Sequence, residues 1–205
     1  MKHGEEFRFT RGDRLWRQGD HARFLVTLCT GVVKLTREWP EGREAVIDLA
    51  FRGDMLGEIV AQPGARHSGT CVALSSGRGI RLPFETVQAL LSSDPTLARP
   101  LLDVALHRQA AFALRLDEMA HGPVENRLAR VLTRIGEQVG LKDARGTFVP
   151  VRLSRSDLAD MVGCRVETTI RVMTRWQREG VVETQREGLI IKEPSVLAEA
   201  ARMTA

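Results

Sequence analysis

The stretch LSRSDLADMVGCRVETTIRVMTRWQREGVVETQREGLIIK, residues 153–192, decides the fold of the C-terminal part of the chain. Ser154 followed by Asp157 has the spacing of a capping box, which predicts the start of a helix. Gly163 predicts the turn after this helix, because glycine accepts a left-handed backbone. A second helix is predicted from Val166 to Glu179, so the stretch has the pattern of two helices joined by a tight turn.

The second helix is predicted to be amphipathic, and a hairpin is predicted to follow it. Its buried side is expected to contain Ile170, Val172, Met173 and Trp176. Its polar side is expected to contain Glu167, Thr168, Arg171, Arg175 and Arg178. The segment VVETQREGLIIK alternates around Arg186-Glu187-Gly188, which predicts two strands and a turn. Helix, turn, helix and hairpin together predict a winged helix-turn-helix, in which the second helix enters the major groove of DNA.

The N-terminal part of the chain has a strand-like pattern from Phe7 to about Leu82. Short apolar runs alternate there with Gly-Asp turns, and such spacing is typical of an antiparallel sandwich or barrel. Turns are expected at Gly12-Asp13, Gly19-Asp20 and Gly53-Asp54.

A helical pattern begins near Pro83. FETVQALLSSD predicts a short helix, and a long helix is predicted from Asp94-Pro95 to about Met119. Steps of four and three along the long helix produce a coiled-coil seam of Leu102, Leu106, Gln109, Ala113, Leu116 and Ala120. A second apolar stripe (Leu101, Ala105, Phe112, Met119) flanks this seam, so one face is expected to cover the domain and the other to bind a second copy.

The segment between the long helix and the helix-turn-helix has its own pattern. Gly122-Pro123 ends the long helix, and Val124 to Val139 predicts a further helix. Residues 140–146 are expected to form a polar loop, and FVPVRL a strand. The predicted fold class is therefore α+β, with a sensor jelly roll over residues 1–92, a dimerisation helix over 93–121 and a winged helix-turn-helix over 122–205.

The composition is that of an ordinary globular protein that favours polyanions slightly. The 205 residues include 27% charged residues and have a formal net charge of +4. The most basic part is the C-terminal one, where residues 122–205 contain 14 Lys and Arg against 11 Asp and Glu. No apolar run has the length of a membrane span, and the N-terminus lacks the pattern of a secretory signal, so a cytoplasmic protein without a membrane partner is expected. Three scattered cysteines, Cys29, Cys71 and Cys164, are expected to be buried apolar residues.

The segment GCRVETTIRVM resembles the recognition helix of the cyclic-AMP receptor protein/fumarate-nitrate reductase regulator (Crp/Fnr) family of bacterial transcription regulators. The family's Glu-Thr-x-x-Arg pattern matches Glu167, Thr168 and Arg171. The resemblance covers nearly the whole chain, because the turns at 9–13, 18–20, 30–34, 42–44, 53–54 and 56–58 look like those of the family's cyclic-nucleotide-binding jelly roll.

The resemblance implies a homodimer that binds a palindromic operator in double-stranded DNA and contacts RNA polymerase. It implies that Glu167 and Arg171 read one G·C pair and that Thr168 contacts a phosphate. Arg165 departs from the family, which usually has Ser or Thr at this N-cap, so the cap is either weaker or replaced by a phosphate contact. The expected DNA-binding residues are Ser154, Arg165, Val166, Glu167, Thr168, Arg171 and Arg175.

The sensor pocket is expected to contain Gly57, Glu58, His67, Ser68 and Gln109, although Gln109 could instead fix the register of the seam. Nucleotide-binding members have an Arg-Ser pair where this chain has His67-Ser68, and histidine cannot make the bidentate phosphate contact of arginine. A shift of one residue in this match would place Arg66 at the phosphate position instead. Cyclic AMP is therefore not the expected effector, and His67 is expected to be a surface or loop residue. Haem and cyclic nucleotides remain alternatives, since His67-Ser68-Gly69 also matches the family's haem-containing sensors, whose cysteine ligand is absent here. An iron–sulfur cluster is not expected, because no cysteine precedes Cys29.

Two other classes of function fit the residues less well. A cupin enzyme would need clustered histidines with HxH spacing, but the five histidines are isolated, so no enzyme and no metal site are expected. A cyclic-nucleotide-controlled interaction module without DNA binding would not require the Glu167 and Arg171 pattern.

Overall fold

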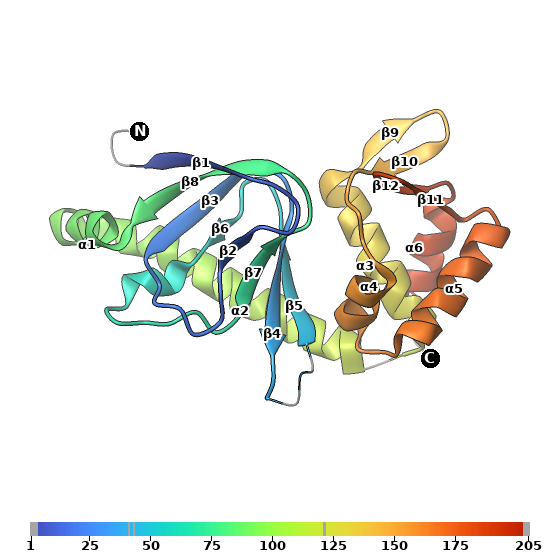
Figure 1. Cartoon of the computed structure of the whole chain (residues 1–205), viewed down its shortest axis with the longest axis horizontal. Helices are drawn as coiled ribbons and strands as arrows, with labels where there is room; N and C mark the ends of the chain where they lie inside the picture. The colour runs from blue at the N-terminus through green and yellow to red at the C-terminus, as the bar shows by residue number, and fades with distance from the viewer. Residues whose placement is uncertain (1–3, 41, 43, 121, 203–205) are drawn as a thin grey trace. The chain divides into compact units, whose positions relative to one another are not determined.

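The computed structural model describes residues 4–40, 42, 44–120 and 122–202, and it divides into two compact units, Met1–Leu114 and Arg115–Ala205. Figure 1 shows the order of their helices and strands. Each unit has its own sheets and its own buried side chains. They are therefore described one after the other.

The first unit is an antiparallel β-roll followed by helices. One sheet has the strand order β1-β8-β3-β6 and the other β2-β7-β4-β5. The strands are β1 Glu5–Phe9, β2 Arg14–Trp16, β3 Phe24–Thr30, β4 Val33–Glu38, β5 Glu44–Ala50, β6 Met55–Leu56, β7 Thr70–Ala73 and β8 Gly77–Pro83. The helices are the 3-10 turns η1 Glu58–Ala61 and η2 Pro95–Leu97 and the α-helix α1 Phe84–Ser93, followed by α2 Ala98–Ala120, whose residues up to Leu114 belong to this unit. The predicted jelly roll, short helix and long helix are confirmed.

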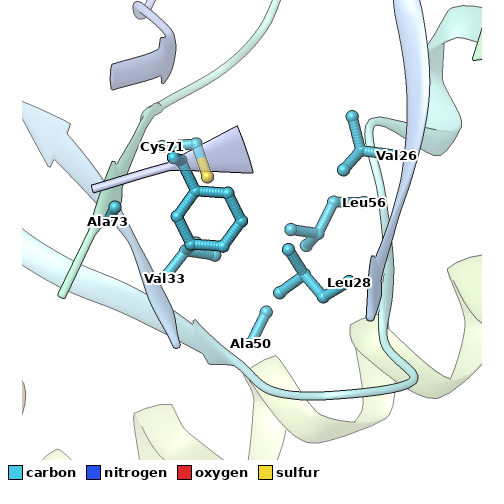
Figure 2. Close-up of a cluster of buried hydrophobic side chains, with 8 residues drawn as sticks. Val26, Leu28, Val33, Ala50, Leu56, Cys71 and Ala73 are labelled. Carbon is cyan, nitrogen blue, oxygen red and sulfur yellow. The ribbon is translucent and has the colours of Figure 1, made fainter. Parts of the chain in front are cut away.

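The core of the β-roll lies between the inner faces of the two sheets. Figure 2 shows Val26, Leu28 and Leu56 facing Val33 and Cys71 across this space. Alternate residues of a strand point to one face, so the apolar half of β3 and β4 forms the core and the rest faces outward. Of the three cysteines only Cys71 is buried, whereas the other two are half-buried, so the expectation for them was wrong. Burial raises the pKa of the Cys71 thiol to about 12.

The Gly-Asp turns share one hydrogen-bond pattern, in which the aspartate carboxylate binds the backbone N–H of the residue three positions earlier. The carboxylate of Asp20 accepts a hydrogen bond from the backbone N–H of Arg17 at 2.8 Å, and Asp54 accepts one from Phe51 at 2.8 Å. The preceding glycine, Gly53, has φ +92°, which only glycine adopts without strain. The predicted turns are therefore confirmed.

The second unit is a winged helix-turn-helix built on a four-stranded sheet of order β11-β12-β10-β9. Its helices are α3 Val124–Val139, α4 Arg155–Val162, α5 Val166–Arg178 and α6 Pro194–Arg202. Its strands are β9 Leu141–Asp143, β10 Gly146–Val149, β11 Val182–Gln185 and β12 Gly188–Ile191. The predicted hairpin is confirmed, because β11 pairs antiparallel with β12 around Arg186 and Glu187.

Two local expectations for residues 140–153 were wrong. Residues 141–143 form β9, which pairs with β10, although the expectation was a loop. The polar sequence hides this strand, whose Lys142 Nζ donates a hydrogen bond to Thr147 Oγ1 at 2.8 Å. The strand predicted for FVPVRL ends at Val149, because Pro150 has no N–H to donate to a neighbouring strand.

Candidate DNA-binding interface and sensor cavity

Helix α4 begins with a complete capping box. The Ser154 hydroxyl accepts a hydrogen bond from the Asp157 backbone N–H at 2.9 Å, and the Asp157 carboxylate accepts one from the Ser154 N–H at 2.9 Å. Gly163 ends the helix with φ 64° and ψ 50°, a left-handed conformation. Helix α5 begins three residues later at Val166, so the turn between the two helices is short.

Helix α5 has one buried and one exposed face. Its buried residues are Thr169, Val172, Met173 and Trp176, and the Trp176 indole N–H also donates to Glu125 Oε1 of α3 at 3.1 Å. Ile170, which was expected on the buried side, is 47% exposed. The helical period explains this error, because residue 170 lies on the same face as residues 167 and 174, whereas 169 follows the stripe of 173 and 176.

The exposed face of α5 contains two side chains of the predicted reading pattern, Glu167 and Arg171. Neither forms a hydrogen bond or ion pair among the residues that the structure describes. Arg165 is exposed at the N-cap and its side chain makes no cap hydrogen bond, as the missing Ser or Thr predicts. Val166 and Thr168 are half-buried beside them. The N-terminal turn of α5 thus offers a guanidinium donor and a carboxylate acceptor on one surface.

Two other residues of the predicted DNA-binding set have partners inside the unit. The hydroxyl of Ser154 belongs to the capping box. Arg175 forms ion pairs with Glu125 and, at 3.9 Å, with Glu179. The hydrogen bond to Glu125 raises the pKa of Arg175, so its charge is partly matched within the protein.

The turn of the hairpin after α5 has an exposed arginine that the site prediction did not include, 3.8 Å from the carboxylate of Glu187. The Arg186 side chain lies at its turn and is 93% exposed. Arg152 Nε donates to Glu187 Oε2 at 3.1 Å, which ties the start of the motif to the same turn. Arg186 could have been predicted from the sequence, because it is a basic residue in the turn of a hairpin that follows a helix-turn-helix.

Helix α2 exposes the predicted seam. Leu102 is 57% exposed and Leu106 52%, and Gln109 and Ala113 are also exposed. The side chains of Leu116 and Ala120 lie outside the described residues. Leu101 of the second stripe packs on the core of the sensor unit and Ala105 is half-buried, but Phe112 is 43% exposed. The face of α2 that contains Leu101 therefore packs on its own unit, while the described seam residues up to Ala113 are accessible.

The predicted pocket residues Gly57, Glu58, His67, Ser68 and Gln109 all line one cavity of about 320 Å³ within the sensor unit. Arg108 of α2 also lines it and binds the β-roll in three ways. Its guanidinium donates to Asp48 Oδ2 at 3.0 Å and to the Met55 carbonyl at 3.2 Å, and it lies 3.5 Å from Glu58 Oε1.

His67 is in a loop, as expected, but it is buried, with 7% exposure, and not on the surface. Its ring stacks on Trp16 with centroids 4.3 Å apart and an angle of 14° between the planes. Burial lowers its pKa, although the charge of Asp20 opposes this shift. The burial of His67 could not be predicted from its neighbours in the sequence, because Arg66 and Ser68 are polar and both are exposed.

Comparison with known proteins assigns both units. The profile of the cyclic nucleotide-binding domain matches residues 6–94, and that of the Crp-like helix-turn-helix domain matches residues 126–200. The chain belongs to the Crp/Fnr family of transcription regulators. It is similar to the "CRP-like cAMP-activated global transcriptional regulator" of Mycobacterium tuberculosis, with 24% identity over 95% of this chain and 87% of the relative.

Two further relatives span most of this Crp/Fnr regulator. The "Fumarate and nitrate reduction regulatory protein" of Escherichia coli is 22% identical over 95% of this chain and 77% of its own length. The crystal structure of a CRP-family transcriptional regulator from Thermus thermophilus has a TM-score of 0.84 at 21% identity, covering 97% of both chains. None of the described helices is long and apolar enough to cross a bilayer.

The described lining of the cavity in this Crp/Fnr regulator offers no free cation to a cyclic phosphate. A cyclic phosphate is an anion, whereas the charged side chains that line the cavity are Asp48, Glu58 and Arg108, and the arginine is already paired with both carboxylates. Arg66 points elsewhere, because its Nη1 donates to the Gly19 carbonyl at 2.7 Å. With the His67 pKa lowered, no uncommitted cation among the described lining residues faces a phosphate.

Proposed function

We propose that this Crp/Fnr-type regulator binds a palindromic operator with α5 in the major groove of each half-site. The observation that carries the proposal is the exposed face of α5, where Glu167 and Arg171 have no partner among the described residues. An arginine can donate two hydrogen bonds to guanine O6 and N7, and a glutamate can accept one from the cytosine amino group. These two residues would therefore read one G·C pair.

The remaining DNA contacts are assigned to the surroundings of this pair. Arg165 and Thr168 would bind phosphates at the N-terminus of α5, where the helix dipole also favours an anion. Ser154, Val166 and Arg175 would contact the backbone or sugar edge, with Arg175 first exchanging its ion pair to Glu125. Such contacts position the protein and make its affinity depend on salt.

We also propose a division of the chain into a sensor over 1–92, a dimerisation helix over 93–121 and a DNA-binding domain over 122–205. The dimer would form through the seam of α2, whose Leu102 and Leu106 are more than half exposed in the single chain. The proposed partners are double-stranded DNA, a second copy and, as the likeness to other Crp/Fnr regulators suggests, RNA polymerase. A protein with these partners is a regulator and not an enzyme, and it acts in the bacterial cytoplasm.

The effector of the sensor is proposed not to be cyclic AMP. Two carboxylates and one paired arginine line the cavity under α2, and these groups repel a cyclic phosphate or leave it without a cation.

Selection of bound duplexes from a random pool, with the protein as purified, tests the DNA assignment. We expect a palindrome with one G·C pair read in each half-site and half-site centres about 34 Å apart. The Glu167→Ala variant should lose preference at that pair and keep non-specific binding. Recovery of no consensus by a folded dimer, both alone and after addition of cyclic AMP or of haem, would contradict the proposal.

A further inference from the structure

A second and larger cavity lies in the sensor unit, with a volume of about 720 Å³. It is lined by residues of β1, β2, β3 and β8 and by the loop around residues 19–23. Trp16 and His67 line both this cavity and the smaller one under α2. The stacked pair therefore separates two cavities of different character.

The larger cavity is basic. The cationic side chains of its lining are five arginines, and its carboxylates are two aspartates. Both aspartates serve the backbone of turns, since Asp13 accepts from the Thr10 N–H at 2.7 Å and Asp20 from the Arg17 N–H at 2.8 Å. The arginines are Arg8, Arg14, Arg23, Arg66 and Arg81. The cavity under α2 has the opposite balance, with two carboxylates and one arginine.

The arginines of the larger cavity differ in how they are held. Arg8, Arg14 and Arg23 are exposed, and their guanidinium groups form no hydrogen bond or ion pair within the described part of the chain. Arg66 is oriented by the Gly19 carbonyl and by His21 Nε2 at 2.8 Å. Uncompensated guanidinium groups around one cavity create a positive potential that attracts anions.

Arg81 adds a surface suited to a planar ring. Its guanidinium lies 5.8 Å from the ring centroid of Phe7 and 5.0 Å from that of Phe24. Glu5 accepts two hydrogen bonds from it, at 3.0 and 2.9 Å, so Arg81 is neutralised and supplies a flat stacking surface more than free charge. The cavity thus combines free cations with aromatic walls, and its volume lies within the range of about 300–1,000 Å³ that is usual for ligand pockets.

We propose that this cavity is a binding site for a small polyanion that has two or more phosphate groups, with the guanidinium groups of Arg14, Arg23 and Arg66 as its ligands. The bound molecule is a nucleoside polyphosphate if the aromatic walls take part, or an inorganic polyphosphate if charge alone decides. The site belongs to the sensor unit and does not rest on the DNA assignment.

Titration calorimetry on the full-length protein, with ATP, sodium tripolyphosphate and adenosine as probes, tests the site. We expect ATP or tripolyphosphate to bind and adenosine to bind at least about tenfold more weakly, since charged hydrogen bonds dominate. Stronger binding of ATP than of tripolyphosphate identifies a nucleotide site, and equal binding identifies a phosphate site.

Two variants and two controls locate the binding. Arg14→Gln/Arg23→Gln removes no internal partner and should weaken polyanion binding at least about tenfold. Arg11→Gln/Arg52→Gln changes two exposed arginines of the same unit outside the cavity and should leave the affinity within about twofold. Arg171→Gln on α5 should also leave it unchanged. Absence of binding by both polyanions, or equal weakening by the control pair or by Arg171→Gln, would overturn the proposal. Failure of operator binding alone would not affect it.

Discussion

Replacement of both exposed seam leucines, Leu102→Ala/Leu106→Ala, should separate the dimer without unfolding the chain. Leu102 is 57% exposed and Leu106 52% exposed in the single chain. Complete burial of a leucine side chain contributes about 1.5–3 kcal/mol, so covering the exposed half contributes about 0.8–1.5 kcal/mol. A symmetric dimer contains two copies of each leucine, so four side chains become covered on association. Because alanine retains part of the contact, the variant should lose about 3 kcal/mol of association free energy.

That loss corresponds to a dimer dissociation constant roughly 100-fold larger. Sedimentation equilibrium over a range of concentrations measures the constant directly. Alanine is the best helix former, so α2 itself should persist, and the far-ultraviolet circular dichroism spectrum should not change.

Leu141→Ala is the matched control, because Leu141 is 59% exposed but lies on β9 and not on the seam. It should leave the dimer constant unchanged. An unchanged constant for the double seam variant, or a wild-type protein that is monomeric at micromolar concentration, would refute the assignment of the interface.

Three further outcomes are expected. Ser154→Ala should lower the free energy of unfolding by about 1 kcal/mol in urea titrations, because the cap of α4 loses its hydroxyl acceptor; an unchanged midpoint would contradict the importance of the capping box. Arg108→Gln should destabilise the sensor unit and loosen α2, since Asp48 and Glu58 lose their shared cation; hydrogen exchange in α2 as slow as in the wild type would argue against this link. The pKa of His67 is lowered in the folded state, so the unfolded state binds the proton better and the free energy of unfolding should fall as the pH drops below about 6.5. A His67→Phe variant should show a weaker fall, and an equal slope of unfolding free energy against pH in both proteins would exclude His67 as its source.

The helix-turn-helix could be predicted closely because its signals are local. A capping box, a glycine turn and an amphipathic period each act within a few residues, and Ser154, Gly163 and Trp176 lie as these signals indicate. Ile170 was misplaced because an apolar side chain was assigned to the core by type, whereas its angle around the helix puts it on the exposed face. Strand β9 was missed because its short sequence does not alternate between apolar and polar residues. Only its pairing with β10 defines it as a strand.

The sensor needed the tertiary structure for a different reason. The sequence by itself determined the family, the β-roll with its Gly-Asp turns and the membership of Glu58 and His67 in one pocket, because these depend on local turns and on a recognisable pattern. Only the folded chain decided that Arg108 is paired with Asp48 and Glu58, that His67 is buried on Trp16 and that five arginines surround a second cavity. Such contacts join residues up to 60 positions apart, and their burial and charge balance arise only when the sheets close around them.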